Sequence, residues 1–63
     1  MKAYRIYLVG SDGRVQLGQA FEAPHDDEAR ERALAHAAKG QVAELWEGGR
    51  MVGRVYEDGV FGP

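Results

Sequence analysis

The only segment of this chain with clear helical periodicity has an apolar face made almost entirely of alanine. At 100° per residue, one half of this helix collects Ala29, Ala33, Leu34, Ala37 and Ala38. The large apolar residues lie instead in segments with strand character. One small alanine-faced helix cannot cover all of them, and the chain has no cysteine with which to form a disulfide. We therefore expect a two-layer domain in which one face of a sheet stays uncovered.

Two strands are predicted before the helix. Residues 4–9 carry apolar side chains at both parities, which is typical of a central strand. The turn at Gly10–Gly13 contains an Asp-Gly pair, a hairpin signal. Residues 14–23 alternate with period two, and we expect their inner face to comprise Val15, Leu17, Phe21 and Ala23.

The helix itself is predicted from about Asp26 to Lys39, roughly 14 residues. Pro24 ends strand pairing, and the acidic run at 26–28 suits the positive end of a helix dipole. Lys39 followed by Gly40 matches the usual signals for a helix C-terminus.

A second hairpin is predicted around Gly48-Gly49, with strands at 41–47 and 50–56. A two-residue loop sets Glu47 opposite Arg50, which makes an ion pair. The same register pairs the apolar residues Trp46 with Met51, Leu45 with Val52, and Val42 with Val55.

These elements predict an α+β fold of the order ββαββ, a four-stranded antiparallel sheet with one helix on one face. A right-handed crossover favours the strand order 2-1-3-4. We expect one domain over residues 1–63, with 57–63 as a loose tail whose Val60 and Phe61 either stay free or dock on a neighbouring surface. The predicted core between helix and sheet comprises Leu17, Phe21, Ala33, Leu34 and Ala37.

Catalytic and metal-binding patterns are absent from the sequence. His25 and His36 lack the spacing of a metal site, Ser11 has no activating base nearby, and Gly48-Gly49 precedes a strand rather than a helix. The acids at 26–28 suit a helix cap better than an acid/base cluster. We therefore expect no enzyme activity, no catalytic residue, no metal and no cofactor.

Charge and hydropathy narrow the choice of partners. The net charge is −2, and the eight basic residues are scattered among ten acidic ones, which argues against a nucleic acid backbone. No apolar run approaches the roughly 18 residues that span a bilayer, and the N-terminal residues lack a signal-peptide core. We expect a cytoplasmic protein that does not contact membranes.

The uncovered sheet face predicts an interaction surface. We expect a homodimer, or docking on another protein, because so small a chain needs additional burial. The residues expected in this interface are Tyr4, Tyr7, Trp46, Met51 and Tyr56. The alternative is a module for single-stranded nucleic acid, in which aromatic residues stack on bases and arginines contact phosphates. The residues for that mode are Tyr7, Trp46 and Tyr56 with Arg5, Arg14, Arg50 and Arg54.

Several short segments resemble a set of small bacterial proteins that share an ELW-type hairpin and have no assigned activity. The resemblance is carried by Tyr4–Tyr7, Asp12-Gly13, Asp26–Ala29 and above all Glu44–Val52. It implies a small bacterial domain and no catalytic residue. One departure is Arg30, where similar proteins tend to have an aliphatic residue. Its side chain either extends to the edge of the apolar face or pairs with Glu22 or a partner subunit.

Overall fold

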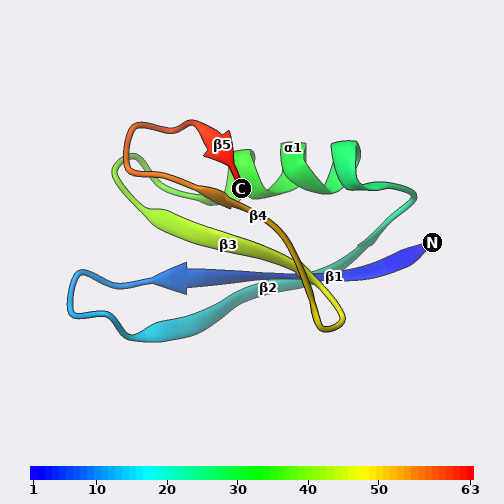
Figure 1. Cartoon of the computed structure of the whole chain (residues 1–63), viewed down its shortest axis with the longest axis horizontal. Helices are drawn as coiled ribbons and strands as arrows, with labels where there is room; N and C mark the ends of the chain where they lie inside the picture. The colour runs from blue at the N-terminus through cyan, green and yellow to red at the C-terminus, as the bar shows by residue number, and fades with distance from the viewer.

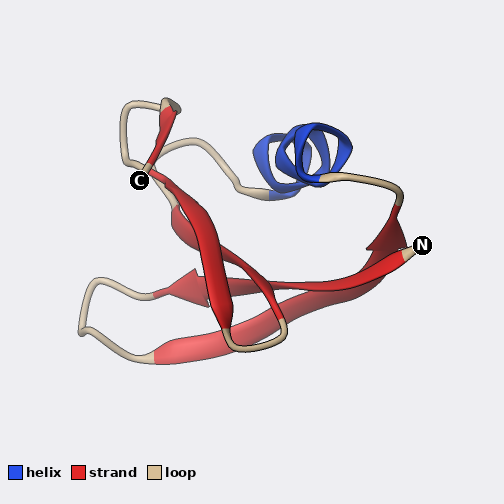
Figure 2. Cartoon of the chain, turned by 45° about the vertical axis from the view of Figure 1, so that its right-hand side comes forward, coloured by secondary structure: helices blue, strands red, loops and turns tan.

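The computed structural model describes residues 1–63 and shows one helix above one face of an antiparallel sheet (Figures 1 and 2). The predicted α+β class with a single helix is confirmed. The elements in chain order are β1 (Lys2–Val9), β2 (Val15–Ala23), α1 (Asp26–His36), β3 (Val42–Glu47), β4 (Arg50–Val55) and β5 (Phe61–Gly62).

The sheet has the order β2-β1-β3-β4-β5, and every neighbouring pair is antiparallel. The predicted order of the first four strands is confirmed, and β1 is an interior strand as predicted, with β2 on one side and β3 on the other. The fifth strand was not predicted, because residues 57–63 were expected to be loose. Phe61 instead pairs with Val55, and its ring covers Gly53, where an added Cβ would lie only 2.4 Å from the ring. The space above Gly53 thus gives the tail a docking place.

The core lies between α1 and the sheet. Its largest fully buried side chains are Tyr4, Ile6 and Leu45, and small residues fill the remaining space: Ala23, Ala29, Ala33, Ala43 and Val55. The alanine face of the helix therefore lets α1 approach the sheet closely, as predicted. Six more apolar residues pack against this core while remaining partly exposed, among them Phe21, Leu34 and Ala37 of the predicted core.

Leu17 does not belong to this core, and the predicted inner face of β2 is wrong for half of the strand. Ile6 pairs with Gln19 but Tyr7 pairs with Leu17, so Gly18 is an extra residue that forms a β-bulge. The bulge turns Leu17 and Val15 onto the face away from α1. A larger residue here would displace its neighbours, because an added Cβ would lie 2.9 Å from Nε2 of His36 and 3.0 Å from Cγ of Leu8.

The second hairpin has the predicted register only near its turn. Glu47 pairs with Arg50 and Trp46 with Met51, as expected. The expected pairs Leu45–Val52 and Val42–Val55 are wrong, because Val52 is an extra residue and the register shifts there. Beyond that bulge, Leu45 pairs with Gly53 and Ala43 pairs with Val55. This register brings Gly53 beneath the ring of Phe61 in β5.

The helix begins at Asp26 as predicted but ends at His36, before the expected Lys39. Its first turn is capped by His25, whose Nδ1 accepts a hydrogen bond from the backbone N–H of Glu28 at 3.3 Å. Ala37 is already extended, with φ −70° and ψ 126°. The chain must leave the helix there because β3 starts beside the end of β1, where Val42 pairs with Val9.

Candidate interaction surface

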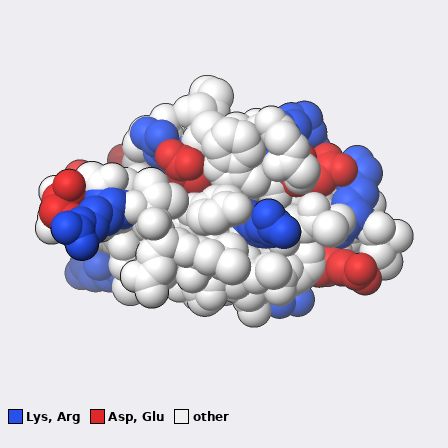
Figure 3. Space-filling model, turned by 90° about the horizontal axis from the view of Figure 1, so that it is seen from below, with Lys and Arg blue, Asp and Glu red and all other residues white.

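The sheet face that points away from α1, called the open face below, carries side chains from four strands. Residues paired across neighbouring strands share a face, so the registers define its members. These are Ala3, Arg5, Tyr7, Val9, Val15, Leu17, Ala20, Glu22, Val42, Glu44, Trp46, Met51 and Arg54. Seen from the side opposite α1, uncharged atoms cover most of the centre, and a single patch of Lys or Arg atoms interrupts them there (Figure 3).

Three of the predicted interface residues lie on this face. Tyr7 and Trp46 are partly buried near its centre, and Met51 is 36% exposed. Trp46 sits between Arg5 on β1 and Met51 on β4 in one row across the sheet. The structure thus brings together residues that are far apart in the sequence.

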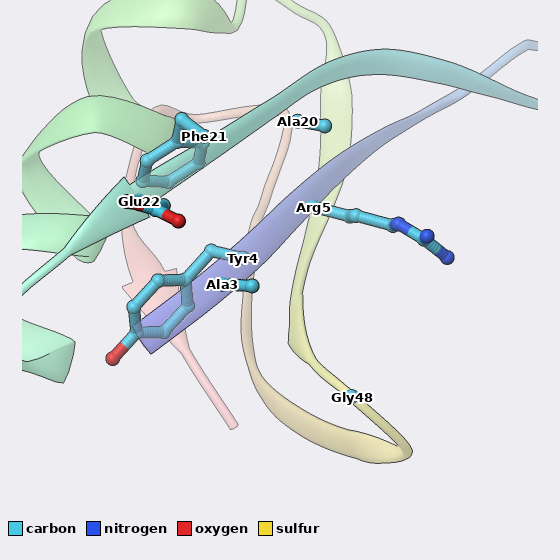
Figure 4. Close-up of a pocket in the computed structure, with 7 residues that line it drawn as sticks. All are labelled: Ala3, Tyr4, Arg5, Ala20, Phe21, Glu22 and Gly48. Carbon is cyan, nitrogen blue, oxygen red and sulfur yellow. The ribbon is translucent and has the colours of Figure 1, made fainter. Parts of the chain in front are cut away.

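Tyr4 was assigned to this surface, and that assignment is wrong. It lies on the helix side of β1, is only 1% exposed, and stacks on Phe21 with ring centroids 5.6 Å apart. Figure 4 shows both rings on one side of the strands while Arg5 and Ala20 point away from them. Even-numbered residues of β1 face α1, which places Tyr4 with Ile6 in the core.

Tyr56 lies at the margin of the open face rather than near its centre. It follows β4 directly and is 39% exposed. Its ring is 5.9 Å from the guanidinium of Arg54, and its hydroxyl donates to the backbone carbonyl of Pro63. Tyr56 therefore ties the C-terminal residues to the sheet.

The sequence prediction missed the most exposed apolar residues of the open face. Val15 is 58% exposed and Leu17 is 52% exposed, although the prediction puts both on the inner face of the strand and Leu17 in the core. The signal that indicates their true position is Gly18, since an isolated glycine within a strand pattern is typical of a bulge.

The carboxylate of Glu44, at the centre of the open face, fixes the indole of Trp46. The indole Nε1 donates to Oε1 of Glu44 at 3.0 Å, and Arg54 donates to Oε2 of the same carboxylate at 2.7 Å. The Glu44 side chain is only 18% exposed, so this pair is better shielded than a surface ion pair. These contacts hold the indole ring of Trp46 in a defined orientation.

The arginines that could contact phosphates are mostly engaged elsewhere. Arg50 pairs with Asp26 and Glu47 on the helix side of the sheet, and Arg14 lies 3.5 Å from Asp12 in the first turn. Arg54 is held by Glu44. Arg5 is exposed and forms no ion pair, and it is the one uncompensated cation of the open face.

Two shallow depressions mark this side of the sheet. A depression of about 490 Å³ lies near the start of β1, and Figure 4 labels its lining: Ala3, Tyr4, Arg5, Ala20, Phe21, Glu22 and Gly48. A second depression, of about 290 Å³, lies nearer the centre and is lined by Tyr7, Val15, Glu44, Trp46 and Gly48. Both hollows are open to solvent.

The strongest electrostatic cluster lies on the other side, around Asp26. Hydrogen bonds from Arg50 and then from Tyr4 lower the pKa of Asp26 to about 2 from 3.8. Burial, followed by the hydrogen bond to Asp26, raises the pKa of Tyr4 to about 12 from 10.0. Hydrogen bonds to Asp26 and then to Glu47 raise the pKa of Arg50 above its ordinary value. All three groups keep one charge state around neutral pH, which suits a structural link between hairpin and helix.

The remaining residues that the sequence singled out have local roles. His25 caps the helix and His36 packs against Gly18, and no group of three or more His, Cys, Asp or Glu side chains is arranged to hold a metal ion. Arg30 is exposed and lies 4.0 Å from Asp27, so its nearest acid is on its own helix rather than Glu22. No helix in the structure has the length and apolar character needed to cross a bilayer.

Comparison of the chain with protein-family models, curated proteins and solved structures gives no match.

Proposed function

We propose that this chain is a small interaction module that forms a homodimer through its open face and has no catalytic role of its own. The observation that carries the proposal is the set of exposed apolar side chains on that face, with Val15 and Leu17 of β2 at 58% and 52% exposure and Met51 of β4 at 36%. A contiguous apolar area on a domain this small is typical of a protein interface.

The small core supports the same proposal. Only nine of the 63 residues are buried, and no disulfide is present. Domains of this size bury a low fraction of their surface, so association adds burial that the single chain cannot supply. A standard interface covers about 800 Å² per partner, which is about a fifth of the accessible surface of 4169 Å².

Binding of single-stranded nucleic acid is the second candidate, and the observation in its favour is Arg5 beside Trp46 on an aromatic sheet face. It is the weaker candidate, because three of the four arginines expected to contact phosphates are paired with carboxylates. Affinity for nucleic acid depends mainly on free positive charge.

Sedimentation velocity over a hundredfold range of concentration tests the dimer. We expect the mass to rise from 6.9 kDa toward twice that value, with a thermal midpoint that rises with concentration. Leu17→Gln should weaken association at least tenfold, because a two-fold interface loses the side chain twice. Val60→Gln is the matched control, since Val60 is equally exposed, at 59%, but lies in the turn before β5.

A chain that stays at 6.9 kDa throughout, with a constant thermal midpoint, would refute the homodimer. Titration with a mixed-sequence oligonucleotide at low salt then tests the alternative. Binding that Trp46→Ala abolishes and that salt weakens steeply would favour nucleic acid as the partner.

A further inference from the structure

Four residues at the centre of the open face form a block in which charged and aromatic side chains alternate. Arg5 on β1 pairs with Trp46 on β3, and the next pair on this face is Tyr7 with Glu44. The two aromatic residues therefore occupy one diagonal of a four-residue block, and the two charged residues occupy the other. Reflection across the aromatic diagonal exchanges the positions of the two charges.

The aromatic diagonal continues to the edge strand. Val15 pairs with Val9, Tyr7 with Leu17, and Trp46 with Arg5, so each step from Val15 to Tyr7 to Trp46 moves one strand across and two residues along. The depression of about 290 Å³ follows this line, because Val15, Tyr7 and Trp46 all contribute to its wall.

The charges on this face favour a second copy as the occupant. Arg5 has no ion pair, and covering it with an apolar partner would leave a cation without an acceptor, which is costly. Glu44 accepts one hydrogen bond on each oxygen, while a carboxylate offers about four lone-pair sites. The same face thus carries a free cation and a carboxylate with acceptor sites left over.

We propose that two copies pack open face to open face about a two-fold axis parallel to the Val15–Tyr7–Trp46 diagonal, which places Arg5 of each protomer against the partner's Glu44. This inference rests on the proposed homodimer and specifies its geometry. Two-fold symmetry makes the contact occur twice. With strands about 4.8 Å apart and residues about 3.3 Å apart, the same operation sets Leu17 near the partner's Val42.

Cross-linking tests this axis directly, because the chain has no cysteine of its own. Packed sheets lie about 10 Å apart, so a bis-maleimide of that span joins residues that face each other. Val15→Cys, on the axis, should link to its own copy. Val42→Cys alone should not, because the axis separates the two copies of residue 42 by roughly 15 Å laterally. A mixture of Leu17→Cys and Val42→Cys should link.

Exposed Val60→Cys measures linking by random collision. Efficient linking of Val42→Cys to itself, or no link above that background for Val15→Cys, would overturn the axis. Sedimentation of the unlinked wild type separates the two claims, because a wild-type dimer with the wrong cross-links refutes only the geometry. A monomer refutes the homodimer as well.

Substitution of Arg5 tests the charge pair. Arg5→Glu and Arg5→Leu should each weaken the dimer at least tenfold, while Arg5→Lys should weaken it less, because it keeps the charge. If Arg5 met only apolar groups, Arg5→Leu would instead tighten the dimer, and that result would overturn the proposed contact with Glu44.

Discussion

The guanidinium of Arg50 donates two hydrogen bonds to the carboxylate of Asp26, from Nη1 to Oδ2 at 3.1 Å and from Nη2 to Oδ1 at 2.9 Å. These residues are 24 positions apart, one at the start of β4 and the other at the start of α1. The hydroxyl of Tyr4 donates to the same carboxylate at 2.7 Å. One acidic side chain therefore connects the second hairpin, β1 and the helix.

Asp26→Asn should lower the denaturant midpoint clearly more than Asp27→Asn. The first change removes the charge that Arg50 holds by two hydrogen bonds, whereas Asp27 is 82% exposed and lies 4.0 Å from its nearest cation. Chemical denaturation at neutral pH and fixed protein concentration measures both. Equal midpoints for the two variants would show that the Asp26 cluster adds nothing to stability.

The contribution of Asp26 should also depend on pH. Its folded pKa, about 2, lies below the ordinary value of 3.8, so its contribution is fully present above about pH 4. It should be lost as pH falls from 4 to 2, and the difference between wild type and Asp26→Asn should shrink over that range. A difference that stays constant down to pH 2 would contradict the shifted pKa.

Tyr4→Phe should change the alkaline side of the stability profile. The folded pKa of Tyr4, about 12, lies above its ordinary value of 10.0, so its contribution is present below pH 10 and is lost between pH 10 and 12. The variant should lack this loss, and denaturation at several alkaline pH values measures it. An identical decline in both proteins would show that Tyr4 ionises as readily when folded as when unfolded.

Ala33→Leu should destabilise the protein by roughly 1–3 kcal/mol, because Ala33 is fully buried where α1 meets the sheet and a larger side chain overpacks the site. Ala35→Leu is the control, since Ala35 is on the same helix but exposed. Thermal or chemical denaturation compares them. A stabilising Ala33→Leu change would mean that the helix does not lie as close to the sheet as described.

Gly48→Ala should cost about 1–2 kcal/mol, whereas Gly49→Ala should cost little. Gly48 has φ +58°, a left-handed conformation that residues with a Cβ disfavour, and Gly49 has no positive φ. An added Cβ meets no atom within 4 Å at either position, so the pair isolates the backbone effect. Similar stabilities for the two variants would show that the turn does not depend on the positive φ of Gly48.

Local patterns in the sequence were enough to predict most elements and the order of the first four strands. The alternation in β2, the Gly48-Gly49 turn and the acidic start of α1 each act over a few residues, so they can be recognised without knowledge of distant contacts. Trp46 and Met51 were placed opposite each other correctly because they lie close to the turn that sets their register.

The residues of the open face were predicted only in part, because two β-bulges change which side chains share a face. Each bulge inserts one residue, so the strand segments before and after it no longer follow the same alternation of faces. Gly18 turns Leu17 and Val15 onto the open face, and Val52 shifts the partner of Leu45 to Gly53. Tyr4 was misplaced for a related reason, since a central strand with apolar residues at both parities does not reveal which parity faces the helix.

The sequence by itself determined the two-layer architecture, because an alanine-faced helix of this length cannot cover so many large apolar side chains on its strands. It also determined that no disulfide supports the fold. Only the tertiary structure decided which apolar residues are buried and which remain exposed, and where the C-terminal residues pair. Those outcomes depend on contacts between distant residues, such as Gly18 with His36 and Gly53 with Phe61, where a glycine lies beneath a ring from another element.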